Sequence, residues 1–353
     1  MNQKMNEKKI RLGLFILFIL VLTGCQTQKF PYEMAADQAE QLLGTIITAK
    51  AYGANAQEAL NLAFNRVGEI ENKMSRYLTD SEVDLINQNA GKKAVPISED
   101  TFFVIQSALD YAEKTDGALN PVIGNISQLW GIGTEDAKIP TQDELNMFLP
   151  HLDYQQLILT QDPYTAKLTS DKMRLDLGAI AKGYAADEMA RILSENGITS
   201  ALLNLGGNVV VLGEKPDHTP WTIGIQDPTQ KNRGEIAGII KAKDISVVTS
   251  GSYERYFEKN GIRYHHIIDP ATGYPAQNGV ISSTIITQSS TLADALSTAI
   301  YILGKDKGLD LIESLSNVEA VIITDDDHIH TSSGISDDIF ILKSEVFTYE
   351  KSR

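Results

Sequence analysis

Apolar positions follow two spacings along the chain, which predict helices and strands in separate blocks. A helical spacing predicts long amphipathic helices at residues 56–77, 100–115 and 291–304, with shorter helices at 140–149 and 309–315. Alternating or continuous apolar runs predict strands at residues 44–53, 156–159, 166–175, 201–213, 221–227, 235–251, 263–269, 280–288, 318–327 and 339–342. Because strands and helices do not alternate strictly, the pattern favours an α+β fold over a doubly wound parallel sheet.

The N-terminus has the pattern of an export signal. Basic residues precede an apolar run at residues 13–22, which is too short to span a bilayer comfortably but suits the core of a signal peptide. Cys25 follows Leu-Thr-Gly and resembles the cysteine of a bacterial lipobox. We therefore expect a signal peptide at 1–24, a lipid on Cys25, a polar tether at 25–42, and a lipid-anchored protein on the extracytoplasmic side of the cell membrane. The alternative is an uncleaved anchor with an incidental cysteine.

Charge and cysteine content narrow the class of protein. Cys25 is the only cysteine, so the exported domain cannot form an internal disulfide. Residues 1–24 carry four basic residues and one acidic residue, so their removal changes the formal charge from -15 to -18. A protein with this much negative charge is repelled by nucleic acid, and it is not expected to dock broadly on anionic lipid. A phosphorylated ligand would need a local helix N-terminus, a lysine or a divalent cation.

The segment DLGAIAKG, residues 176–183, has the chemistry of an anion site without a known nucleotide fingerprint. It fits no Walker A motif, and the later NLGGNVVVLG segment supplies no Rossmann turn. A strand-like run passes here into a helix whose first-turn amides are unpaired, and Lys182 adds a positive charge. Asp176 can accept hydrogen bonds from a ligand or face a cation. In the alternative, Lys182 is solvated and Asp176 only caps the helix.

Two neighbouring histidines precede an Asp-Pro turn in the segment HHIIDPATGYPA. On a strand His266 shares a face with Ile268, while His265 points the opposite way. An adjacent pair at a strand end is a candidate for acid–base chemistry, because histidine titrates near neutral pH. The alternative is a turn with exposed histidines.

Asp294 and Thr298 lie four residues apart on one face of a predicted helix. A carboxylate and a hydroxyl so placed can both bind a hard cation such as Mg²⁺. In the alternative, Thr291 and Asp294 form a capping box, and Thr298 bonds back to the carbonyl group of Asp294.

Seven segments together resemble one protein family in their order along the chain. They are MSRY, DGALNPVIG, DLGAIAKGYAAD, NLGGNV, TSGSYER, HHIIDPATGYP and ADALSTA, and they resemble the ApbE family of FAD:protein FMN transferases. The resemblance covers about residues 43–345 and leaves 346–353 as a C-terminal tail. It implies a single catalytic unit of one or two lobes, with mixed, mainly antiparallel sheets flanked by helices.

The resemblance also implies roles for individual residues. Those implied to contact FAD are Leu43, Tyr77, Ala118, Leu119, Asn120, Asp176, Lys182 and Ile268. Mg²⁺ is implied to bind Asp294, Thr298 and the backbone carbonyl of Ala179, and His266 matches the proposed catalytic base. The chain departs from the family at Asn120, where Asp is common, and at Leu43, where Met is usual; both changes bear on FAD affinity.

The activity implied by the resemblance is Mg²⁺-dependent transfer of the FMN half of FAD to a threonine or serine hydroxyl of an exported acceptor protein, with release of AMP. Two alternatives stay open. One is Mg²⁺-dependent hydrolysis of FAD to FMN and AMP, in which water replaces the acceptor. The other is a surface lipoprotein that binds flavin and performs no chemistry.

Overall fold

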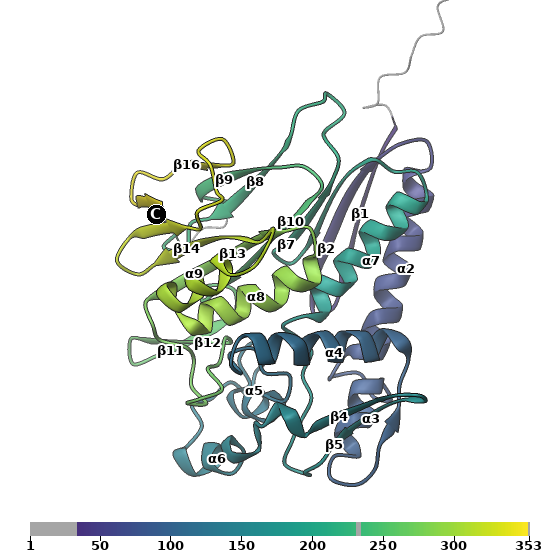
Figure 1. Cartoon of the computed structure of the whole chain (residues 1–353), viewed down its shortest axis with the longest axis vertical. Coiled ribbons are helices and arrows are strands. Elements are labelled where there is room, and N and C mark those ends of the chain that lie inside the picture. Colours follow the sequence, from purple (N-terminus) through teal and green to yellow (C-terminus); the bar gives the residue numbers. More distant parts are fainter. Residues whose placement is uncertain (1–33, 231–233, 352–353) are drawn as a thin grey trace, which may run out of the picture.

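One large sheet forms the centre of the molecule (Figure 1). The computed structural model describes residues 34–230 and 234–351, so the predicted signal peptide, Cys25 and the first part of the tether lie outside the described residues. Within them, all neighbouring strands of this nine-stranded sheet are antiparallel except the last two. In sheet order they are β1 (Ala35–Leu42), β2 (Thr45–Tyr52), β6 (Ser200–Leu205), β7 (Asn208–Leu212), β10 (Ile245–Gly251), β13 (Val280–Thr287), β14 (Glu319–Thr324), β15 (His328–Thr331) and β17 (Thr348–Lys351).

Helices cover one face of this main sheet. They are α2 (Ala56–Met74), α7 (Ala181–Glu195), α8 (Ser290–Leu303) and α9 (Lys305–Glu313). Helix α2 packs against α7, and α7 packs against α8, which lies over β10 and β13. Buried positions of α2 such as Leu60, Ala63, Phe64 and Val67 recur at helical spacing, which confirms the amphipathic pattern expected there.

A second, smaller sheet covers the opposite face. It contains β16 (Phe340–Leu342), β9 (Ile236–Ala242) and β8 (Trp221–Gln226), in that order. Trp221 and Phe340 from this sheet share a hydrophobic cluster with Val247 and Ile323 of the main sheet. The main sheet is therefore buried on both faces near its centre, which explains why β13 and β14 read as nearly continuous apolar or small residues.

Helices and short strands extend the molecule beyond α2 and α7, in the lower part of Figure 1. They are α3 (Glu82–Gln88), β3 (Val95–Pro96), α4 (Glu99–Lys114), α5 (Gly124–Trp130), α6 (Gln142–Asn146), the 3-10 helices η2 (Leu149–His151) and η3 (Tyr154–Gln156), β4 (Leu157–Gln161) and β5 (Tyr164–Leu168). Leu157 and Ala166 belong to the same buried cluster as Leu60 of α2 and Leu203 of the main sheet. The core is thus continuous across these elements.

A hairpin joins this lower part to the main sheet. It consists of β11 (Tyr256–Lys259) and β12 (Ile262–His265). Tyr264 stacks on Trp130 of α5, with ring centroids 5.5 Å apart, and Trp130 Nε1 donates to the Gly273 carbonyl at 2.7 Å. These contacts hold the segment around His266 between α5 and the main sheet.

The structure corrects three expectations drawn from the pattern. Ala35–Leu42 form strand β1, so this part of the predicted tether belongs to the sheet. The predicted tail contributes β17 and the buried Phe347, so it is also part of the domain. Residues 169–175 form no strand: only an isolated bridge between Arg174 and Ile123 occurs there. The helices predicted at 100–115 and 291–304 are confirmed within one residue.

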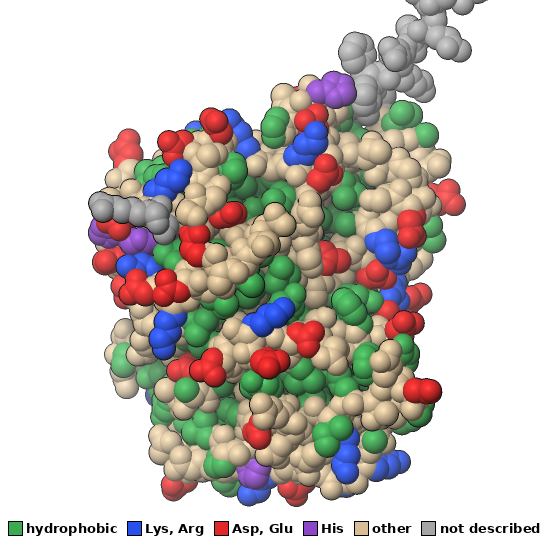
Figure 2. Space-filling view, viewed as in Figure 1, with side chains coloured by type: hydrophobic (Ala, Val, Ile, Leu, Met, Phe, Trp, Pro, Cys, Tyr) green, Lys and Arg blue, Asp and Glu red, His purple; other side chains and the backbone are tan. Residues whose placement is uncertain are grey.

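Charged groups are distributed over the surface. On the face drawn in Figure 2, acidic side chains are scattered and basic side chains form no continuous patch. Among the described residues, no helix is long and apolar enough to cross a membrane.

One partly buried charge cluster ties α2, α4 and α7 together. Arg66 of α2 bonds to Asp100 of α4 at 2.6 Å and to Glu188 of α7 at 2.8 Å. Lys73 and the Tyr184 hydroxyl also donate to Asp100. Although burial acts in the opposite direction, hydrogen bonds from Arg66, Lys73 and Tyr184 hold the pKa of Asp100 well below its ordinary value. The cluster therefore fixes α7, the helix that carries Lys182, against its neighbours.

Asp100→Ala should lower the free energy of unfolding at pH 7 by about 3 kcal/mol, because it leaves Arg66 buried without one of its carboxylates. Since the pKa of Asp100 is lowered in the folded protein, its contribution is fully present above its unfolded pKa near 3.8 and is lost as the pH falls below it. The difference between parent and variant should therefore shrink in acid. Urea unfolding at pH 7 and pH 3.5 measures it.

The matched control is Asp110→Ala, which removes an exposed carboxylate on the same helix. It should change the unfolding free energy by less than about 0.5 kcal/mol. Equal losses in the two variants would contradict the role given to the cluster.

Candidate active site

Helices α7 and α8 cross with no room for a side chain between them. A Cβ atom added to Gly183 would lie 2.2 Å from the carbonyl oxygen of Ser290 and 2.8 Å from Cβ of Asp294. One turn further along α7, the Asp187 carboxylate accepts hydrogen bonds from the backbone N–H groups of Ser290 and Thr291, at 2.7 and 2.9 Å. Asp187 thus satisfies the N-terminus of α8 from a neighbouring helix. Together these contacts fix Asp294 against the first turn of α7.

Asp294 is a buried carboxylate held by that first turn. Its side chain is only 3% exposed. Oδ1 accepts from Lys182 Nζ at 2.8 Å, and Oδ2 accepts from the backbone N–H of Gly183 at 2.9 Å. Lys182 Nζ also donates to Oδ1 of Asn208, at 3.2 Å. The alternative of a solvated Lys182 is therefore wrong.

The capping alternative for Asp294 and Thr298 is also wrong. The N-cap residue of α8 is Ser289, whose side chain accepts from the backbone N–H of Leu292. The hydroxyl that donates to the Asp294 carbonyl is that of Ser297, at 3.0 Å. Oγ1 of Thr298 instead lies 3.3 Å from Oγ of Ser250. The Asp294 carboxylate therefore does not cap its own helix.

The carbonyl group of Ala179 accepts no hydrogen bond among the described residues. In a regular helix its partner would be the N–H of Gly183, which donates instead to Asp294. This free carbonyl, one carboxylate and the hydroxyl of Thr298 are oxygen donors of the kind that a hard cation prefers, so the residues fit Mg²⁺. No group of three His, Cys, Asp or Glu residues suited to a metal occurs in the described ranges, but the predicted set needs only one carboxylate.

His266 directly follows the hairpin. Its Nδ1 lies 3.2 Å from the backbone carbonyl of Arg255, which fixes Nδ1 as the donor and leaves Nε2 free to accept a proton. Desolvation by the surrounding protein lowers the pKa of His266 to about 4, and the charges of Arg255 and Lys182 contribute. The side chain is still reached by water, so the ring is crowded and accessible at once. A neutral, accessible imidazole is the form that a base needs.

His265 has a different environment. The strand predicted at 263–269 ends at His265, so His266 lies outside it and is exposed, whereas Ile268 is buried; the strand face expected to be shared by His266 and Ile268 is wrong. His265 is 5% exposed, its Nε2 lies 3.0 Å from the Ala276 carbonyl, and its ring meets Tyr301 edge-on. Burial lowers its pKa to about 4. His265 therefore packs the core, and the alternative of two exposed histidines is wrong.

Arg255 links His266 to the turn between β1 and β2. Its guanidinium donates to the carbonyl of Gly44 at 3.1 Å, next to Leu43. Leu43 has a positive φ of 52°, and its N–H donates to Glu71 at 2.8 Å. The structure thus brings the segment of Leu43 toward His266.

Asp176 and Tyr77 meet through Arg76. Asp176 Oδ2 lies 2.9 Å from Nη1 of Arg76, whose guanidinium covers the ring of Tyr77. Oδ1 of Asp176 accepts from Gly178, and the N-cap of α7 is Ile180, so Asp176 does not cap that helix. Tyr77 is 72% exposed, so its ring can stack on an aromatic ligand on the face that Arg76 does not cover.

The other residues implied to contact FAD are largely covered. Asn120 is 9% exposed; its Nδ2 donates to the Leu152 carbonyl, and its Oδ1 accepts from Val122. An ionised aspartate could not donate to Leu152, which explains why this chain accommodates Asn. Ala118, Leu119 and Ile268 are also buried, at 8%, 4% and 5% exposure. Their contacts with FAD stay a prediction.

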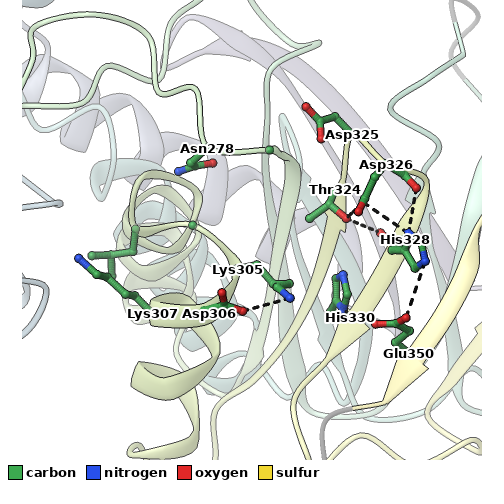
Figure 3. Close-up of a pocket in the computed structure, with 13 residues that line it drawn as sticks. Asn278, Lys305, Asp306, Lys307, Thr324, Asp325, Asp326, His328, His330 and Glu350 are labelled. Atoms are coloured by element: carbon green, nitrogen blue, oxygen red, sulfur yellow. Dashed lines mark hydrogen bonds and ion pairs between the residues drawn. The ribbon is translucent and has the colours of Figure 1, made fainter.

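A cavity of about 600 Å³ lies elsewhere, at the edge of the main sheet near β15 and β17 (Figure 3). None of the predicted site residues lines it. Its histidines are already engaged: His330 Nδ1 lies 3.3 Å and His328 Nε2 lies 3.7 Å from Glu350. The candidate active site is therefore the α7–α8 crossing, where Asp294 and Lys182 meet, rather than this cavity.

Comparison with known proteins identifies the family. The model of the ApbE family matches residues 43–322. The chain belongs to the ApbE family. It is 36% identical over 349 residues to the FAD:protein FMN transferase of Treponema pallidum (strain Nichols), covering 94% of this chain and 96% of that protein. The crystal structure of the ApbE protein from Thermotoga maritima is similar with a TM-score of 0.78 at 32% identity, covering 85% and 97%. The flavin transferase ApbE from Vibrio cholerae is similar with a TM-score of 0.74 at 27% identity, covering 89% and 98%.

Four residues of this ApbE site were given no role by the sequence analysis. They are Gly183, Asp187, Asn208 and Arg255. All four lie inside motifs that carried the resemblance to the family, and Asp187 is the last residue of DLGAIAKGYAAD. Only the motif membership signalled them, because each acts through a contact with a distant segment.

Arg255→Gln should raise the pKa of His266 toward its ordinary value of 6.5, because it removes a positive charge near the ring. NMR titration of the histidine ring protons in the ligand-free protein measures this, with His266→Gln used to assign the resonance.

Arg263→Gln is the matched control on the same hairpin. Arg263 lowers the pKa of His265 and is not among the main causes that lower the pKa of His266, so this variant should change the titration of His266 far less than Arg255→Gln does. A His266 resonance that moves equally in both variants, or in neither, would contradict the assignment.

Proposed function

We propose that this protein transfers the FMN half of FAD to a threonine or serine hydroxyl of an exported acceptor protein and releases AMP. It is a flavin transferase of the ApbE family. The observation that carries the proposal is the meeting of Asp294, Lys182 and the free carbonyl of Ala179 at one helix crossing. This arrangement suits a cation and a phosphate group together, which a pyrophosphate substrate requires.

The residues proposed to bind FAD include groups that compensate the negative charge of its pyrophosphate. The pyrophosphate is an anion and the chain is acidic, so Lys182 would face the pyrophosphate. The first-turn amides of α7, expected to be unpaired, are not assigned this role, because Ala181, Gly183 and Tyr184 already donate to Leu177, Asp294 and Ile180. Asp294, Thr298 and the carbonyl of Ala179 would hold Mg²⁺, which supplies positive charge near the scissile phosphate when bound. Exposed Tyr77 would cover an aromatic ring of the ligand.

His266 is assigned as the base. Its Nδ1 is occupied by the Arg255 carbonyl, so Nε2 takes the proton of the acceptor hydroxyl. The hydroxyl oxygen then forms a bond to the phosphorus of the FMN half. The bond between that phosphorus and the bridging oxygen breaks, and AMP leaves with the electron pair. The product is a phosphoester between FMN and the acceptor.

Intact-mass analysis of an acceptor incubated with the protein, FAD and Mg²⁺ tests the proposal. Transfer adds FMN to the acceptor and forms an equal amount of AMP. Hydrolysis forms free FMN and AMP without any mass change, and a binding protein forms neither. Asp294→Ala is the inactive control, and a flavin adduct that forms as fast with this variant as with the parent would overturn the site.

His266→Ala should slow transfer by about 10²–10⁴-fold, because it removes the proton acceptor from the attacking hydroxyl. FAD affinity, followed by flavin fluorescence with Mg²⁺, should change little. Rates are measured at saturating FAD.

His151→Ala is the control for loss of a histidine, since His151 lies on η2, outside the candidate site, and its ring forms a hydrogen bond with Ser170. His265 is not a suitable control, because its buried ring supports the core. If His266→Ala transfers FMN at the parental rate, another group is the base; if it loses FAD altogether, His266 holds the ligand.

We also propose that the mature protein is anchored by lipid on Cys25 and faces the outside of the cytoplasmic membrane. The support is the Leu-Thr-Gly-Cys sequence after a short apolar run. Cys25→Ala should yield an unprocessed precursor or a protein released from the membrane. Fractionation and gel mobility measure both, and a variant that behaves like the parent would exclude the lipobox.

A further inference from the structure

The pairing of Lys182 with Asp294 places a positive charge where the cation of the proposed function would bind. Lys182 Nζ is 2.8 Å from Oδ1 of Asp294 and Gly183 N–H is 2.9 Å from Oδ2, so both oxygens of the buried carboxylate are already used as acceptors. A divalent ion approaching the same carboxylate meets this ammonium group at close range. Like charges at such distances repel strongly where water is excluded.

Lys182 has an outward route that Asp294 lacks. The lysine side chain is 23% exposed, whereas that of Asp294 is 3% exposed. Its other partner is the neutral oxygen Oδ1 of Asn208, at 3.2 Å. A flexible lysine can therefore move its charge toward an anion outside, while the carboxylate stays in place.

Asn208 shows that the hydrogen bonds around Lys182 are incomplete when Lys182 is paired with Asp294. Asn208 is 1% exposed, and its Nδ2 has no hydrogen-bond partner among the described residues. The side-chain amide directs Oδ1 toward Lys182, and the Nδ2 group is left buried without an acceptor. An unpaired buried donor is unfavourable, so this arrangement is one that the protein can leave readily when another partner for Lys182 arrives.

We propose that Lys182 couples the binding of Mg²⁺ to that of the FAD pyrophosphate, by neutralising Asp294 when both are absent and moving to the phosphate when both are present. Mg²⁺ alone would leave Lys182 displaced without an anion. Pyrophosphate alone would take Lys182 and leave Asp294 buried without a cation. Each ligand therefore strengthens the binding of the other. The inference rests on the proposed function only for the identity of the two ligands.

Calorimetric titration of the ligand-free protein with Mg²⁺ alone tests the coupling. Lys182→Met removes the competing charge and keeps the length of the side chain, so it should bind Mg²⁺ at least about 5-fold more tightly than the parent, the lower end of typical coupling between sites. Lys182→Arg keeps the charge and should not bind it more tightly. Lys243→Met, which removes an exposed lysine paired with Glu214, controls for net charge and should match the parent.

A second measurement uses FAD and the parent protein. FAD should increase Mg²⁺ affinity by about 5–150-fold, and Mg²⁺ should increase FAD affinity by the same factor. This factor should be smaller in Lys182→Met. Should that variant fail to fold by circular dichroism, Lys182→Gln replaces it, because its amide can still donate to Asp294.

Mg²⁺ affinity in Lys182→Met that equals or falls below that of the parent would overturn the coupling. These titrations contain no acceptor protein, so they do not depend on transfer. If the parent transfers FMN and Lys182→Met does not bind Mg²⁺ more tightly than the parent, the coupling alone is refuted. If Lys182→Met binds Mg²⁺ more tightly but the parent transfers no FMN, the proposed function alone is refuted.

Discussion

Burying the carboxylate of Asp294 requires groups that compensate its charge, and in this fold they come from another helix and another strand. Lys182 and Gly183 supply hydrogen bonds from the first turn of α7, and Asn208 at the start of β7 holds the lysine. These groups meet only because α7 and α8 approach without an intervening side chain. The main sheet and the charge cluster of Arg66 fix the helices at that separation. The chemistry of the site thus depends on packing that extends well beyond it.

Helices and strands could be predicted from the sequence where only one of their faces is buried. Helix α4 repeats apolar residues at helical spacing, because one face of this helix packs on the core. Strand β1 was missed because its sequence, AADQAEQL, is mostly exposed at the edge of the sheet and carries no alternating apolar pattern. The strand expected through Arg174 was wrong. Its apolar residues Met173 and Leu175 are buried, but they lie in an irregular segment whose isolated bridge joins Arg174 to Ile123, just before α5.

The candidate site was predicted in part. Spacing alone placed Asp294 and Thr298 on one helical face, and Lys182 at the start of another. It could not reveal that these helices cross, because Lys182 and Asp294 are 112 residues apart in the chain. For the same reason the capping alternative named Thr291, while the carboxylate that accepts from the N-terminus of α8 is that of Asp187, 103 residues before Ser290. Such long-range partners are absent from any local pattern.

The missing side chain at Gly183 has a consequence for redesign. The carbonyl of Ser290 would lie 2.2 Å from any Cβ atom placed there, so even one methyl group would push the helices apart. The spacing between the two helices is therefore a mechanical stop, set by backbone against backbone. Attempts to redesign the proposed cation site should leave this crossing intact and vary the side chains at its rim, such as Thr298.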